Sequence, residues 1–263
     1  MLAPLHRYLI ALALLVAASS ASAESYQEPR TGEDVQALVD RADMTYRGRT
    51  TAAVLEMRVK ASTYSRNYRL VYWDRRRGEG RSLVKILGPS LWRGYGTLKV
   101  GEQLKLYNPK RNQITVVSQS MLGDRWMGSH FTNDDLVKHT RLGKHYVARL
   151  IRKYPGATTL YKVELTPKRN APVAWGKIIY QLSKTGNIVL PVRADYYRRR
   201  GSRRATRTIT WRRVGRLGGR IIPKEMKVVL ADKPGENTLI RFKKIRFDVN
   251  VPGRRFSQNQ LRR

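Results

Sequence analysis

Alternation of apolar and polar positions with a period of two limits the fold of this chain more than any other feature. From Thr51 onward, Ala53, Leu55, Met57 and Val59 recur at every second position, which places one apolar row on one face of a β-strand. Similar runs occupy residues 68–73, 82–87, 98–100, 103–107, 113–118, 146–154, 159–166, 177–183, 191–199, 206–214, 221–231 and 238–248. Glycine and proline separate these runs at short intervals, so the sequence predicts an antiparallel meander.

Two internal segments depart from this period. An apolar stripe at helical spacing predicts a helix that starts with Thr31 as its N-cap, has Asp34 in its first turn and ends at Gly48. The second segment lies between residues 120 and 146, where a short helix from Thr132 as N-cap to about His139 is predicted. The tail over residues 256–261 is also predicted to be helical.

These elements predict a mainly antiparallel β fold with a few helices. Neither a repeat nor a linker nor a composition step divides the chain, so residues 31–263 are predicted as a single β domain after a leader over residues 24–30. A strongly curved sheet with an apolar interior would suit a small-ligand carrier. In the alternative, the helices fill the interior and leave no cavity.

The N-terminus has the pattern of a secretory signal peptide. Arg7 precedes a short apolar run over residues 8–18, and Ala21-Ser22-Ala23 supplies a small-residue cleavage site. The run of about eleven residues is too short to span a bilayer, which takes roughly twenty. Cleavage near Ala23 and export to the periplasm are therefore predicted. Without any cysteine, the chain cannot form disulfides or carry a lipid anchor on a cysteine.

The chain is extremely basic, with 53 Lys and Arg against 19 Asp and Glu and a net charge of +34. Loss of residues 1–23 removes only Arg7, leaving +33. Such a charge gathers anions, and anionic membrane head groups are the expected partners of an exported chain. In the alternative, the charge merely reflects genome composition.

Arginine is most concentrated over residues 193–220, which hold eleven Arg and one Asp. The sequence predicts either a solvated sheet face or an anionic docking surface, because Arg binds phosphate bidentately. The predicted docking residues are Arg198, Arg199, Arg200, Arg203 and Arg204. Charge-only recognition of polyanions, nucleic acid included, is the alternative, although no specific nucleic-acid-binding motif is present.

Catalytic signals are scarce. The chain lacks the G-x-S-x-G elbow, the Walker loop and the dinucleotide fingerprint. His130, Asp134 and His139 match no established metal-ligand spacing. A non-enzymatic protein with neither metal nor cofactor is therefore predicted, and a lipid-modifying hydrolase ranks well behind.

Residues 106–112 (LYNPKRN) and 120–137 (SMLGDRWMGSHFTNDDLV) form the most distinctive stretch. It resembles the outer-membrane lipoprotein-sorting proteins of the LolA-like superfamily, in the branch with a WMGSDFTNDDL-like segment after a YNP turn. Residues 92–98 (WRGYGTL) and 190–197 (LPVRADYY) are similar to further parts of that family. His130 stands where the family pattern has Asp, and Tyr95 is an extra residue between two glycines.

The resemblance implies an unclosed, half β-barrel with a helical lid over a concave hydrophobic face. It also implies a periplasmic carrier that shuttles an acylated ligand, a lipid or lipoprotein, between inner and outer membrane, beside an inner-membrane transporter. The basic charge favours an anionic ligand, and a monomer is expected. Burying an acyl chain contributes about 0.8 kcal/mol per methylene, so large apolar side chains are expected to line the site. The candidates for this lining are Trp73, Trp92, Tyr107, Trp126, Met127 and Phe131.

Overall fold

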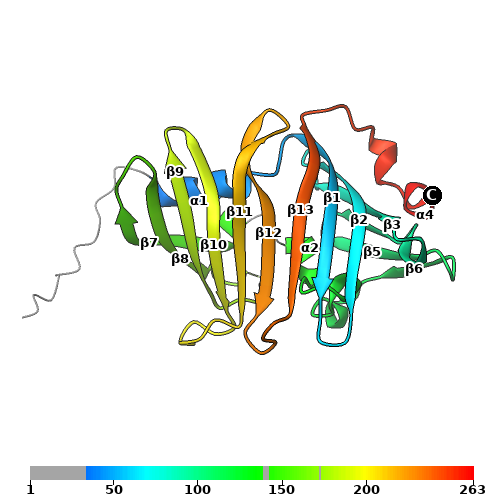
Figure 1. Cartoon of the computed structure of the whole chain (residues 1–263), viewed down its shortest axis with the longest axis horizontal. Helices are drawn as coiled ribbons and strands as arrows, with labels where there is room; N and C mark the ends of the chain where they lie inside the picture. The colour runs from blue at the N-terminus through cyan, green and yellow to red at the C-terminus, as the bar shows by residue number, and fades with distance from the viewer. Residues whose placement is uncertain (1–33, 139–141, 172) are drawn as a thin grey trace, which may run out of the picture.

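The computed structural model describes residues 34–138, 142–171 and 173–263, and Figure 1 shows one curved sheet with short helices beside it. The strands are β1 (Thr50–Lys60), β2 (Ser65–Arg75), β3 (Arg81–Gly88), β4 (Gly96–Val100), β5 (Gln103–Asn108), β6 (Gln113–Val116), β7 (Tyr146–Tyr154), β8 (Thr159–Pro167), β9 (Lys177–Thr185), β10 (Ile188–Tyr197), β11 (Arg207–Leu217), β12 (Arg220–Leu230) and β13 (Asn237–Phe247). The helices are α1 (Val35–Asp43), α2 (Asn133–Lys138), α3 (Leu142–His145) and α4 (Gln258–Arg262).

All thirteen strands belong to one sheet, in the order β6-β5-β4-β3-β2-β1-β13-β12-β11-β10-β9-β8-β7. Every pairing is antiparallel, and β1 pairs with β13, so the first and last strands meet in the middle of the sheet. The edge strands β6 and β7 do not pair with each other within the described residues. The predicted antiparallel, unclosed β-barrel is therefore confirmed.

Period-two alternation directs apolar residues of most strands toward the main core. Met57, Val59, Leu70 and Ile209 are buried there, and helix α1 covers the same face, packing against β7, β9 and β10. The helix contributes Leu38, Val39 and Ala42 to the main core. A helix on the concave face is thus held by burial of its apolar stripe, as its spacing predicted.

A second cluster lies on the opposite, convex face of β2–β6. Trp73, Leu83 and Tyr107 pack there against Phe256 and Leu261 of the C-terminal segment. Gly96 permits the approach, because a Cβ at this position would lie 2.7 Å from Leu261 Cδ1. Lys85 Nζ donates to the carbonyl of Leu261 over 2.6 Å, which satisfies a free carbonyl of α4.

Helix α1 differs from the sequence prediction at both ends, and it ends at Asp43 and not at Gly48. Asp34, not Thr31, is the N-cap of α1 and accepts from the backbone N–H of Gln36 at 2.8 Å; Thr31, the leader and the signal peptide lie outside the described residues. The helix predicted from Thr132 to about His139 is described only as far as Lys138. The separate turn of α3 was not predicted, because four residues carry no measurable period.

Candidate functional site

A cavity of about 270 Å³ lies between helix α1, the loop that precedes α2, and the concave face of the sheet. Its volume is close to the lower end of the range for small-molecule sites, about 300–1,000 Å³. The apolar lining comes from both halves of the sheet and from the helical side: Ala42, Leu55, Leu70, Val84, Leu104, Trp126, Phe131, Leu136, Trp211, Met226, Ile240, Phe242 and Ile245. The helices therefore leave a hollow in the curved sheet.

Trp126 and Phe131 form the part of the lining that comes from outside the sheet. Both are buried, and the indole Nε1 of Trp126 donates to Thr97 Oγ1 on β4 at 2.9 Å. The backbone N–H of Trp126 also donates to the carbonyl of Phe131 at 2.8 Å. Positive φ angles at Met127 and Gly128 close the turn between the two aromatic residues. The 125–132 loop thus presents both rings to the cavity.

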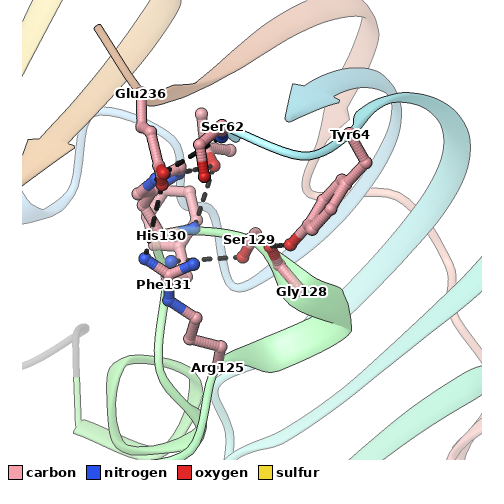
Figure 2. A network of polar contacts seen from close by, with 9 residues as sticks. Ser62, Tyr64, Arg125, Gly128, Ser129, His130, Phe131 and Glu236 are labelled. Atoms are coloured by element: carbon pink, nitrogen blue, oxygen red, sulfur yellow. Dashed lines mark hydrogen bonds and ion pairs between the residues drawn. The ribbon is translucent and has the colours of Figure 1, made fainter. Parts of the chain in front are cut away.

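The 125–132 loop is anchored to two turns of the sheet through buried polar contacts (Figure 2). The imidazole of His130 lies 2.8 Å from Thr238 Oγ1 through Nδ1 and 3.2 Å from Glu236 Oε2 through Nε2. The backbone N–H of Ser62 donates to Glu236 Oε1 at 3.0 Å, and Tyr64 Oη donates to the carbonyl of Gly128 at 2.6 Å. The β1–β2 and β12–β13 turns therefore hold this loop from one side.

The surroundings of His130 and Glu236 shift the pKa values of both side chains. Burial lowers the pKa of His130, while the hydrogen bond from its ring to the Glu236 carboxylate acts in the opposite direction. The backbone N–H of Ser62 is the main cause that lowers the pKa of Glu236 to about 2. Burial thus favours the uncharged form of the His130 imidazole beside this carboxylate.

A buried ion pair holds the start of α2. Asp135 accepts from the backbone N–H of Thr132 at 2.7 Å and its N–H donates to Thr132 Oγ1 at 3.3 Å, so Thr132 is the predicted N-cap in a capping box. Both Asp135 carboxylate oxygens also accept from Nη1 of Arg207, at 2.7 and 2.8 Å. The Arg207 guanidinium is buried, with the ring centre of Tyr196 4.9 Å away and that of Trp175 5.6 Å away.

Asp43, at the end of α1, is an acidic residue of the cavity wall. Burial raises the pKa of Asp43 to about 7, although its Oδ2 accepts from the backbone N–H of Leu142 at 2.7 Å. The nearby Arg47 acts in the opposite direction. The wall therefore carries a carboxyl group that is mostly protonated below neutral pH.

Only two of the six predicted lining residues, Trp126 and Phe131, face the cavity. Met127 and Trp92 are partly buried against the same core but do not line the cavity. Trp73 and Tyr107 lie in the convex cluster beneath the C-terminal segment. The structure thus divides the predicted set between three places.

The predicted docking arginines, Arg198, Arg199, Arg200, Arg203 and Arg204, are all exposed in the β10–β11 loop. Strand register places this loop at the same end of the sheet as Lys60 and Asn237. The β2–β3 turn, which contributes to the cavity lining, lies at the opposite end, beside Thr50. The β10–β11 loop and the part of the cavity beside the β2–β3 turn are therefore separated by the length of the strands.

The sequence interpretation missed most of the strand residues that line the cavity, including Tyr180, Trp211 and Met226. Their positions follow the period-two alternation, so the alternation did mark them as inward-facing. It could not separate residues that face the hollow from residues that pack in the solid core.

Two further observations concern the described residues only. No group of three or more His, Asp or Glu side chains among them is arranged to hold a metal ion. None of the helices formed by residues 34–138, 142–171 and 173–263 has the length and apolarity needed to cross a bilayer.

Comparison with solved structures identifies the fold. A DUF1329 family protein from Desulfovibrio piger superposes with a TM-score of 0.75 at 18% identity, covering 86% of this chain and 97% of that one. A structure from Vibrio parahaemolyticus, named as an outer membrane lipoprotein-sorting protein domain, matches with a TM-score of 0.73 at 17% identity. The match covers 87% of this chain and 98% of that one. A LolA superfamily protein from Nitrosomonas europaea matches with a TM-score of 0.69 at 20% identity, over 87% and 99%.

At the level of sequence, no curated protein matches the chain. A family model with the description "Uncharacterized protein" matches residues 78–263, which is more than half of the chain. This range includes the cavity-lining strands β4, β5 and β9–β13 and the 125–132 loop. The chain belongs to this family, and it has the LolA-like fold that its sequence resembled.

Proposed function

We propose that this protein is a periplasmic, non-enzymatic carrier that holds an acyl chain of a lipid or lipoprotein in the cavity of its half-barrel. The observation that carries the proposal is the apolar hollow of about 270 Å³ between the sheet and helix α1. A soluble carrier has to replace the membrane around the tail, and each buried methylene contributes about 0.8 kcal/mol. Leu55, Trp211 and Met226 belong to the surface that would supply this burial.

The fold comparisons support the same proposal. One of the structural relatives is named for outer membrane lipoprotein sorting, and another is a LolA superfamily protein. The signal peptide proposed for residues 1–23 would bring the chain to the periplasm, where such a ligand moves between inner and outer membrane. A monomeric state and an inner-membrane transporter as donor are further parts of the proposal.

Organic extraction of the purified mature chain tests the carrier function. The expected result is a lipid or acylated species that co-purifies in stoichiometric amount and is identified by mass spectrometry. If the extract contains no acylated species and the protein takes up no fluorescent acyl probe, the carrier function is wrong. An extract of an unrelated basic periplasmic protein, prepared in parallel, controls for lipid that adheres through charge.

A second candidate function, recognition of polyanions by charge alone, is favoured by the exposed arginines of the β10–β11 loop. In that case binding to an anionic membrane or nucleic acid would weaken steeply with added salt, because counterion release drives it. Binding of a buried acyl tail depends far less on salt. The two candidates therefore differ in a titration at two ionic strengths.

A further inference from the structure

The cavity reaches the surface at the β2–β3 turn. Its lining includes Asp74, Gly80 and Ser82 at this turn, together with the exposed residue Arg76. Alternation along β2 sets Tyr72 and Asp74 on the concave side, and Arg76 follows in the same phase. A ligand tail inside the hollow would therefore leave its polar end near this turn.

Basic residues outnumber acidic residues in the lining of the cavity. The basic ones are Arg47, Arg75, Arg76, Arg81 and Lys99, and the acidic ones are Asp43, Asp74 and Asp135. Two of these arginines, Arg75 and Arg81, lie beside groups that do not line the cavity. Arg81 donates to Glu79 Oε1 at 2.8 Å, and Arg75 Nη1 would lie 3.1 Å from a Cβ at Gly253 in the C-terminal segment. The other cations of the lining are Arg47, Arg76 and Lys99.

The acidic residues of the lining offset only part of this charge. Asp135 is bonded to the buried Arg207, and Asp43, at the end of α1, accepts from the backbone N–H of Leu142. Asp74 is the acidic group at the mouth, with its Oδ1 3.9 Å from Arg47 Nη2. No ion pair to Arg76 is formed by any residue that the structure describes.

Because it rests on the carrier function proposed above, the next step concerns the head group of the ligand. We propose that Arg76 and Lys99, with Arg47 behind them, bind the phosphate of an amphiphile whose acyl tail occupies the cavity. Arg presents a planar fork that fits phosphate oxygens, and Lys adds a point charge. The arginines of the β10–β11 loop cannot serve this group, since they lie at the other end of the strands.

The experiment compares an alkyl phosphate with the alkyl alcohol of equal chain length, by calorimetric titration of the full mature chain. The variant is Arg76→Gln/Lys99→Gln, and its control is Lys244→Gln/Arg246→Gln, which removes the same two charges from exposed positions on β13 outside the cavity lining. The head-group variant is expected to bind the alkyl phosphate about tenfold more weakly. Its affinity for the alcohol, and both affinities of the control, should change less than about twofold.

Each alternative outcome has a separate meaning. An unchanged affinity for the alkyl phosphate, or an equal loss for phosphate and alcohol, overturns the head-group inference while the carrier function stands. If neither amphiphile binds the wild-type chain, the carrier function itself fails. Displacement of the alkyl phosphate by inorganic phosphate at a comparable concentration would make free phosphate the ligand and overturn a lipid source. Arg76→Gln alone, at an exposed position, serves if the double variant does not fold.

Discussion

At the scale of single residues, the most informative side chain of the site is a carboxyl group in the wall of the cavity. Burial raises the pKa of Asp43 to about 7, while in the unfolded chain an Asp titrates near 4. The folded chain therefore binds an additional proton between about pH 4 and pH 7. Since protonation favours the folded state, stability contributed by this group is present at low pH and is lost as the pH rises through 7.

Asp43→Asn should remove this dependence on pH. At about 1.4 kcal/mol per pKa unit, the variant should be up to about 4 kcal/mol more stable than the wild type at pH 8 and similar to it near pH 4. Urea unfolding at a series of pH values measures the difference. Parallel curves for the two proteins, with a constant offset, would show that the carboxyl group is not buried in this way.

At the scale of elements, the C-terminal segment explains why aromatic residues alone did not locate the site. Trp73 and Tyr107 looked equivalent to Trp126 and Phe131 in the sequence, because all four are large aromatic residues. The C-terminal helix α4 covers the convex face and buries the first two there. Long-range packing of this kind has no local signature, so the sequence could not predict which face was covered.

Leu261→Ala tests this division of the aromatic residues. Leu261 is fully buried, and comparable substitutions cost about 2–5 kcal/mol, so the free energy of unfolding should fall by a similar amount. The affinity for a fluorescent acyl probe should remain within about twofold, since the convex cluster is on the other side of the sheet from the cavity. A large loss of probe affinity in a variant that is still folded would place the binding surface beneath α4 instead.

Other elements were predictable because local chemistry determines them. Period-two alternation predicted the strands, and Thr132 as N-cap, followed by acidic residues in the first turn, predicted the start of α2. The Asp135–Arg207 pair joins residues 72 positions apart, and the contact of His130 with Glu236 spans 106 positions. Neither partner could be assigned without the fold, although both pairs hold the segment that presents Trp126 and Phe131.

At the scale of the whole molecule, the sheet separates three surfaces that the sequence left together. The concave face carries the apolar hollow, the convex face is partly covered by the C-terminal segment, and the β10–β11 loop lies at one end of the strands. The fold class was accessible from alternation and from the resemblance. The sequence could not predict that a hollow remains inside the sheet, because the same inward-facing residues could equally have packed into a solid core. The division of the chain into a signal peptide over residues 1–23, a leader over residues 24–30 and a single domain over residues 31–263 stays a prediction.

Filling the hollow is the most direct test of the account, because its central claim is that an acyl chain lies there. Leu55→Trp/Met226→Trp adds two large rings to the lining, at a cost of about 1–3 kcal/mol per site. Val214→Trp, at an exposed position on β11, is the matched control. Titration with a fluorescent acyl probe should give saturable, one-to-one binding by the wild type and the control, and at least about tenfold weaker binding by the filled variant. Equal probe binding by all three folded proteins would contradict the claim.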